Sequence, residues 1–161
     1  MQVRDYTPDQ ADAFLTLYRA CLKHYKIPTA TPAQEARVVT LLDSERHMSC
    51  LMAYEDDQPL GFATWVLTFP ACASLALYMK EIFVLGTARS KGVGRALLDA
   101  LLHRAEAEGC IRMDWQTDVS NEQSQTFYDN VRAPKFDKIT YRVSRDDFAD
   151  FRKQLVRPLA K

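Results

Sequence analysis

The sequence predicts an α+β fold in which helices pack against a mixed β-sheet, formed by a single domain that spans residues 1–161. Three observations lead to this prediction. Amphipathic stretches with helical spacing are mixed with short apolar runs typical of strands. A polar turn joins two of the apolar runs, as in an antiparallel hairpin. The chain is long enough to bury a substantial core, and its sequence has no internal repeat, low-complexity stretch or interdomain linker.

The first segment of the chain predicts a short strand followed by a helix. The strand is expected at Val3 to Tyr6. The helix runs from a cap at Thr7 or Asp9 to about Tyr25, before Pro28 ends the helical pattern. Its apolar face consists of Phe14, Leu15, Tyr18, Cys21 and Leu22.

A second helix and a hairpin are expected next. Thr31 caps a helix from about Pro32 to Leu42, with proline at the first helical position. The apolar runs Cys50 to Tyr54 and Leu60 to Phe69 flank the polar segment Glu55 to Pro59. They are therefore predicted to pair as an antiparallel hairpin.

The centre of the chain predicts a strand, a glycine-containing turn and a helix. The strand covers Leu75 to Leu85, and the helix runs from about Gly92 to Glu108. Gly109 ends this helix as a left-handed cap residue. The side chains expected to face the core are Leu97, Leu98, Leu101 and Leu102.

The last third predicts two more strands and two more helices. Cys110 to Gln116 is expected to be a strand, and Asn121 to about Val131 a short helix. Ile139 to Val143 alternates as a strand would, and Asp146 to Leu155 has helical spacing.

Composition excludes several classes of protein. The 21 basic residues balance 21 acidic ones, which gives no indication of nucleic-acid binding. No apolar run approaches the roughly 18 residues that span a bilayer, and no signal-peptide pattern opens the sequence, so no membrane association is expected. The four cysteines lack metal-ligand spacing and are interpreted as reduced thiols of a cytoplasmic protein, with no bound metal expected; they are Cys21, Cys50, Cys72 and Cys110.

The most informative segment is the turn between the central strand and the central helix. Glycines can adopt positive φ and let the backbone approach a bulky anion. Amides in the first turn of a helix lack intrahelical acceptors and lie at the positive end of its dipole, where they can bind phosphate oxygens. The sequence therefore predicts a pyrophosphate-binding turn formed by Arg89, Ser90, Lys91, Gly92, Val93, Gly94 and Arg95.

The alternative is a glycine-softened helix start with solvated basic residues. Other phosphate-binding turns do not fit the sequence. No Gly-Lys-Ser or Gly-Lys-Thr follows, as a nucleotide triphosphatase loop requires, and the third glycine of a dinucleotide fingerprint is missing.

Two motifs together resemble the GNAT superfamily of N-acetyltransferases. Arg89-x-x-Gly92-x-Gly94 is similar to its phosphate-binding signature, Arg/Gln-x-x-Gly-x-Gly/Ala. Asn121-x-x-Ser124-x-x-Phe127-Tyr128 is similar to its second motif, about 30 residues further on. The resemblance is close from Met79 to Tyr141. A glycine usual in the family four residues after the tyrosine is replaced here by Arg132.

The resemblance implies a three-layer α/β/α arrangement around a mixed, mostly antiparallel sheet with two parallel strands that splay apart. Acetyl-coenzyme A would bind in the gap. The spacing Trp115-x-Thr117-x-x-x-Asn121 and the pair Tyr141-Arg142 resemble a subgroup that acetylates small amines, polyamines or basic protein tails. The implied reaction is transfer of acetyl to a primary amine of a small basic acceptor by direct attack. Protein lysines, or a non-catalytic acyl-coenzyme A sensor, are the alternatives. A homodimer is possible because the superfamily often dimerises.

Acetyl transfer requires a polarised carbonyl, a proton for the leaving thiolate and a neutral amine. Backbone amides at Phe83, Val84 and Leu85 are implied to polarise the thioester and pair with the pantetheine arm. Tyr128 is the candidate general acid, because a phenol is protonated at neutral pH; packing of its helix is the alternative. Glu81 is the candidate base, with an ion pair to Lys80 or another basic neighbour as the alternative.

Asn121 either caps its helix or hydrogen-bonds the pantetheine. The histidines His24, His47 and His103 are interpreted as surface or packed side chains. The acceptor pocket is expected between residues 18–32 and 65–76. Its aromatic wall would consist of Tyr18, Tyr25, Trp65, Phe69 and Tyr78, and its acidic rim of Glu55, Asp56 and Asp57; core aromatics and a solvated turn are the alternative.

Overall fold

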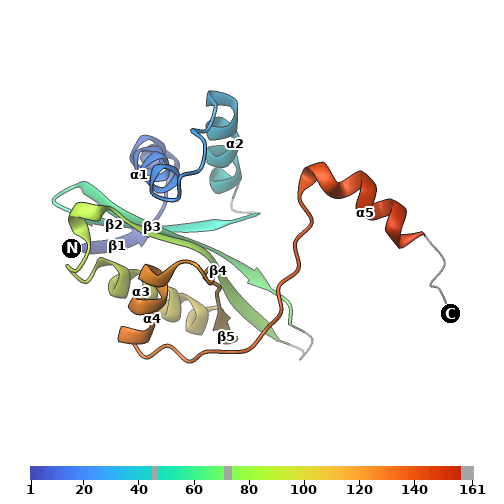
Figure 1. Cartoon of the computed structure of the whole chain (residues 1–161). Helices are drawn as coiled ribbons and strands as arrows, with labels where there is room; N and C mark the ends of the chain where they lie inside the picture. The colour runs from blue at the N-terminus through green and yellow to red at the C-terminus, as the bar shows by residue number, and fades with distance from the viewer. Residues whose placement is uncertain (45–46, 71–73, 157–161) are drawn as a thin grey trace. The chain divides into compact units, whose positions relative to one another are not determined.

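The computed structural model describes residues 1–44, 47–70 and 74–156. It divides into two compact parts, residues 1–125 and 126–161, which are considered separately. The first part holds a five-stranded sheet in the order β1-β2-β3-β4-β5 (Figure 1). Its strands are β1 (Gln2–Asp5), β2 (Ser49–Glu55), β3 (Gln58–Thr68), β4 (Leu75–Val84) and β5 (Cys110–Asp114).

The sheet is mixed, as predicted. The pairs β1–β2, β2–β3 and β3–β4 are antiparallel, whereas β4 and β5 are parallel. Helices α1 (Ala11–His24) and α2 (Pro32–Asp43) cover one face, and α3 (Val93–Ala107) covers the other (Figure 1). The predicted three-layer α+β fold is therefore confirmed.

Local sequence sets the ends of the first two helices. A 3-10 turn, Pro8–Gln10, leads into α1, and the Thr7 amide donates to Gln10 Oε1 at 3.3 Å. At the start of α2, the Thr31 amide donates to Gln34 Oε1 at 2.8 Å, and Gln34 N donates to Thr31 Oγ1 at 3.3 Å. Thr31 is thus the predicted cap, and it forms a reciprocal capping box.

The β2–β3 hairpin has a tighter turn than predicted. Asp56 and Asp57 both have positive φ, 47° and 61°, which is the geometry of a two-residue hairpin turn. Pro59 therefore lies within β3 and not in the turn. Further along β3, a Cβ on Gly61 would lie 2.5 Å from the carbonyl oxygen of Phe83, so only glycine permits this close approach of β3 to β4.

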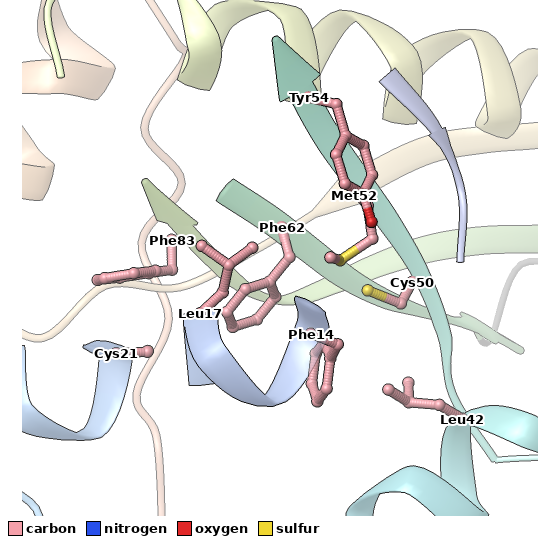
Figure 2. Packing of buried hydrophobic residues seen from close by; sticks show 9 residues of the cluster. All are labelled: Phe14, Leu17, Cys21, Leu42, Cys50, Met52, Tyr54, Phe62 and Phe83. Carbon is pink, nitrogen blue, oxygen red and sulfur yellow. The ribbon is translucent and has the colours of Figure 1, made fainter. Parts of the chain in front are cut away.

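The core between α1 and the sheet is built from alternate strand residues. Phe14 packs edge-on against Phe62, with 5.2 Å between ring centroids, and Leu17 is fully buried. Figure 2 shows these side chains between α1 and the strands. The whole cluster consists of Phe14, Leu17, Cys21, Leu42, Cys50, Met52, Tyr54, Phe62 and Phe83. On the opposite face, Leu97, Leu98 and Leu101 are buried as predicted, but Leu102 is 50% exposed because it lies beyond the apolar stripe of α3.

The second part contains the end of α4 (Glu122–Asn130), a 3-10 turn (Arg145–Asp147) and α5 (Phe148–Leu155), which confirms the last helix. The predicted strand Ile139–Val143 is wrong: among the described residues, no strand forms there. The alternation of Ile139, Tyr141 and Val143 is present, but an extended segment needs a neighbouring strand to satisfy its backbone groups. Strand β5 is also shorter than predicted, since it ends at Asp114 and not at Gln116.

Candidate active site

The central feature of the candidate site is the edge of β4 that continues beyond its parallel neighbour β5. Their paired residues are Leu75 with Cys110, Leu77 with Met113 and Tyr78 with Asp114. Strand β5 ends at Asp114, while β4 continues to Val84 along β3. The second half of β4 therefore has no strand on its β5 side among the described residues. Its outward amides and carbonyls can pair with an extended ligand.

The predicted pyrophosphate-binding turn follows β4 directly. A 3-10 turn, Gly86–Ala88, ends the strand, and α3 begins at Val93 with Gly92 as its N-terminal cap at φ +84°. Ser90 also has positive φ, 61°. These two left-handed residues bend the chain tightly ahead of α3, so that the free amides of its first turn point out of the helix.

This turn fits a pyrophosphate group. A Cβ placed on Gly92 would meet no atom within 4 Å, so the surface beside it is open. Lys91 and Arg95 are exposed on the same short segment, and Gly94 lies in the first turn of α3. Open backbone, a helix N-terminus and two cations are the chemistry that a pyrophosphate requires.

The guanidinium of Arg89 is held by hydrogen bonds to three separate segments. Nε donates to the Val84 carbonyl at 3.2 Å, Nη1 donates to Gln123 Oε1 at 2.8 Å, and Nη2 lies 3.3 Å from His24 Nε2. Arg89 is half-buried. Its side chain therefore fastens the end of α1, the end of β4 and the start of α4 to one another.

A second link joins the same two helices. Asn121 Oδ1 accepts from the Ser124 amide at 3.0 Å, which confirms the predicted cap of α4. Asn121 also hydrogen-bonds the side chain of Tyr25, the residue after α1. The pKa of Tyr25 is nevertheless raised, chiefly by burial. The predicted contact of Asn121 with pantetheine stays a prediction.

Glu81 lies in the unpaired half of β4. It is the antiparallel partner of Thr64, and it shares a face with Phe83, two residues further along. Partial burial raises the pKa of its carboxyl, and the charge of Lys80 opposes this shift. The Lys80 ion pair is long, 4.0 Å, and both side chains are about half exposed, so it contributes little.

Several other ionisable groups surround Glu81. The pKa of the Cys21 thiol is raised to about 12, mainly by burial and secondarily by the charge of Glu81. The charge of Glu81 also contributes to the raised pKa of Tyr25, after burial and Cys21. The described cysteines Cys21, Cys50 and Cys110 are free thiols with raised pKa values, which makes them poor nucleophiles; Cys72 lies outside the described residues.

Tyr128, the candidate general acid, lies in α4 and is buried, with 8% of its surface exposed. Its ring is 5.2 Å from that of Phe127, so it contributes to packing. Tyr128 belongs to the second part of the chain, and its role beside the sulfur stays a prediction.

The predicted acceptor wall is only partly assembled. Trp65 is buried beneath the Arg104 guanidinium of α3, 5.8 Å from its ring, on the face opposite α1; it is a core residue. Phe69 is 78% exposed. Tyr18 and Tyr25 lie on α1 and at its end, and Tyr78 is the last residue of β4 paired with β5.

The predicted acidic rim is a solvated turn. Asp56 and Asp57 close the β2–β3 hairpin, whereas Thr64, the partner of Glu81, lies well along β3. At about 3.3 Å per residue, this separates the turn from Glu81 by roughly 20 Å. The turn is therefore too distant to contact an amine held at Glu81.

Comparisons with known proteins identify the family. Residues 11–131 match the model of the acetyltransferase (GNAT) family, so the chain belongs to that family. The prediction of an acetyl-coenzyme A-dependent N-acetyltransferase is confirmed at this level.

Two relatives by sequence carry related names. Over 66 residues the chain is 39% identical to the D-amino-acid N-acetyltransferase HPA3 of Saccharomyces cerevisiae, which covers 41% of this chain and 40% of that protein. It is 28% identical to the uncharacterized N-acetyltransferase YhfO of Bacillus subtilis over 80% of this chain and 87% of that one.

Solved structures share the fold. An integron cassette protein of V. cholerae superposes with a TM-score of 0.81 at 26% identity, over 94% of this chain and 97% of that chain. The aminoglycoside acetyltransferase AAC(6')-Iy, in complex with a coenzyme A bisubstrate analogue, superposes with a TM-score of 0.74 at 18% identity, over 89% and 97% of the two chains. No helix among the described residues is long and apolar enough to cross a membrane.

Three residues near the site were missed by the sequence analysis: His24, Gln123 and Thr64. His24 is an exposed histidine that also packs near the Phe83 ring, at 6.1 Å, which agrees with its interpretation as a surface or packed side chain; its contact with Arg89 was not foreseen. No short motif marks these positions, because each one reaches the site only through the pairing of elements distant in sequence. The strand register would have identified Thr64, as the residue opposite Glu81.

Proposed function

We propose that the protein transfers the acetyl group of acetyl-coenzyme A to a primary amine of a small basic acceptor by direct attack. One observation carries the proposal. Glu81, a half-exposed carboxyl with a raised pKa, lies in the half of β4 that extends past β5, a few residues before the predicted pyrophosphate-binding turn. A base is thus expected next to the place where a thioester would lie.

Coenzyme A would be held at two places. The turn Arg89 to Arg95 would bind its pyrophosphate, chiefly through backbone amides with Lys91 and Arg95 nearby. The free edge of β4 from Phe83 to Leu85 would pair with the pantetheine arm, and an amide there would polarise the thioester oxygen. Coenzyme A supplies the activated acyl group as a thioester.

The reaction exchanges one bond at the acetyl carbon. The amine nitrogen forms a C–N bond as the C–S bond breaks. Glu81 accepts the proton that leaves nitrogen, directly or through water, and Tyr128 donates a proton to the departing thiolate. One proton is thus taken up and one released, so free coenzyme A leaves as the thiol.

The charge of the site favours a cationic acceptor. The Glu81 carboxylate attracts an ammonium group and repels an acid, and the pyrophosphate-binding cations lie beyond Val84. An amino acid is the second candidate, because the relative HPA3 is named a D-amino-acid N-acetyltransferase. Lysine-rich protein tails and a non-catalytic acyl-coenzyme A sensor are the remaining alternatives, and a homodimer and a cytoplasmic location stay predictions.

Thiol release from acetyl-coenzyme A tests the proposal. The panel contains polyamines, D- and L-amino acids, aminoglycosides, arylamines and lysine-rich peptides, with mass spectrometry of the products. Pairing each amino acid with its amide isolates the effect of the carboxylate. Preferred acetylation of polyamines supports the proposal. Faster acetylation of amino acids than of their amides would instead identify amino acids as the acceptor class. Tight coenzyme A binding without turnover on any acceptor would favour the sensor.

A further inference from the structure

Thr64 on β3 carries a hydroxyl that is buried without a hydrogen-bond partner among the described residues. The residue is 3% exposed, and its Oγ1 is fully enclosed. Burying an unpaired hydroxyl is unfavourable, and valine would fill the same space without this cost. Thr68, a partly buried threonine further along β3, has a partner, since its Oγ1 donates to the Ala76 carbonyl at 3.2 Å.

The strand register places this hydroxyl beside the candidate base. Thr64 pairs directly with Glu81, and the next pair on the same face is Phe62 with Phe83, both in the core under α1. Side chains of directly opposed residues start about 5 Å apart at Cβ. Register irregularity between Thr64 and Trp65 ends this pairing immediately afterwards, so Thr64 is the last β3 residue before the ladder shifts.

A hydrogen bond to this hydroxyl would require the Glu81 side chain to turn from Lys80 toward Thr64. In the structure its Oε1 lies 4.0 Å from Lys80 Nζ, a half-exposed pair that is easily exchanged. The groups that face Glu81 are Lys80 on its own strand, Cys21 of α1 and Tyr25 after α1. Neither the thiol nor the phenol is charged at neutral pH, so the Thr64 hydroxyl is a fitting donor on the buried side of the carboxylate.

We propose that Thr64 is a positioning residue for acetyl transfer, whose hydroxyl donates a hydrogen bond to the Glu81 carboxylate and orients it toward the acceptor amine. The inference rests on the proposed role of Glu81 as base. It accounts for a hydroxyl that is buried where the described residues offer it no hydrogen-bond partner. Thr64 itself takes no proton; the proton that leaves nitrogen still goes to Glu81.

The direct test measures the pKa of Glu81 in the whole protein. The carboxyl is titrated while NMR monitors its resonance in a 13C-glutamate-labelled sample. The resonance is assigned by its absence in Glu81→Gln. A donor to the charged form lowers a carboxyl pKa. Thr64→Val is therefore expected to raise the Glu81 pKa by about one unit, and Thr64→Ser to restore it. The same midpoint in wild type and Thr64→Val would overturn the inference, whether or not an acceptor has been found.

Kinetics and stability give a second signature. Thr64→Val is expected to lower kcat about tenfold, a small part of the roughly 10²–10⁴ that a general base contributes, with no loss of Tm and no change in the Kd for acetyl-coenzyme A. Thr68→Val is the matched control on the same strand. It should lower Tm slightly, because its hydroxyl has a structural partner, and it should leave the Glu81 pKa unchanged.

Failure of the inference can be distinguished from failure of the proposed base. An impaired Glu81→Gln with a fully active Thr64→Val would remove Thr64 and leave the base in place. A fully active Glu81→Gln would remove both.

Discussion

The Nη2 atom of Arg89 lies 3.3 Å from Nε2 of His24, although the two residues are 65 positions apart in the sequence. Because the arginine is a cation and can only donate, the histidine must be neutral and accept the hydrogen bond through Nε2. Gln123 accepts from Nη1 at 2.8 Å, so Arg89 links the end of α1 to the start of α4 beside the end of β4.

Arg89→Lys tests this tie. Lysine keeps the positive charge but has a single ammonium group that cannot serve three acceptors in a fixed plane. The expected loss is about 1–2 kcal/mol in the free energy of unfolding, measured by urea denaturation. Arg95→Lys, an exposed change in the first turn of α3, is the control and should change stability little.

Coupling between Arg89 and His24 should show in a double-mutant cycle. Arg89→Lys and His24→Gln are expected to be non-additive, because each removes the same contact. Burial, and then the charge of Arg89, lower the pKa of His24 below its ordinary value of 6.5. The folded state therefore binds fewer protons than the unfolded state near this pH, so the contribution of His24 to stability is complete above 6.5 and is lost as the pH falls toward the lower folded value. Additive losses and an unchanged pH dependence in His24→Gln would contradict the tie.

Gly92→Ala tests the pyrophosphate-binding turn against a matched glycine. Gly92 and Gly109 have positive φ, 84° and 67°, and a Cβ at either position meets no atom within 4 Å. Each alanine should therefore cost a similar 1–2 kcal/mol of stability, roughly the cost of left-handed geometry. Calorimetry should find weaker coenzyme A binding for Gly92→Ala alone, because only there would the methyl group meet the pyrophosphate. Equal affinity of the two variants would remove the turn as the binding site.

Tyr128→Phe tests the general acid. Removing the phenol should lower kcat by roughly 10²-fold, since no other donor is assigned to the thiolate, while the Kd for coenzyme A changes little. The control is Tyr141→Phe, which alters an 87% exposed ring. A variant with wild-type kcat would return Tyr128 to the packing role suggested by its contact with Phe127.

The fold could be predicted because local sequence signals and the final structure agree in most elements. Thr31, Gly92 and Gly109 mark helix ends through their own backbone chemistry, and each was placed correctly. The predicted strand at Ile139–Val143 was wrong, because alternating apolar residues indicate which face of a strand would be buried but not whether a neighbouring strand is present to pair with it. The prediction that Leu102 is buried was wrong, because consecutive leucines do not indicate which of them lie on the buried face of α3.

The site was only partly predictable, for a related reason. The residues of the turn Arg89 to Arg95 are consecutive in the chain, so the motif can be recognised from the sequence alone. The contacts of Arg89 with His24 and Gln123, and the pairing of Thr64 with Glu81, depend on register and helix placement, which a single sequence does not encode locally. The distance of Asp56 and Asp57 from Glu81 likewise follows only from the register of β3.

Glu81→Gln tests the candidate base by activity and by stability. Partial burial raises the pKa of the Glu81 carboxyl, so the folded state holds this proton more tightly than the unfolded state. As the pH rises above the ordinary glutamate value through the raised one, the carboxyl ionises and stability falls. Glutamine removes this cost. Glu81→Gln should therefore have a higher Tm than wild type at neutral pH, and the difference should vanish in acid.

Activity should change in the opposite direction. A base must be ionised, so wild-type kcat/KM should rise with pH through the raised Glu81 pKa, and Glu81→Gln should be slow and lack this rising limb. Glu55→Gln, in the exposed end of β2, is the control and should keep the wild-type profile. A Glu81→Gln variant that is more stable but retains the rising limb would show that the partly buried carboxyl destabilises the fold without a catalytic role.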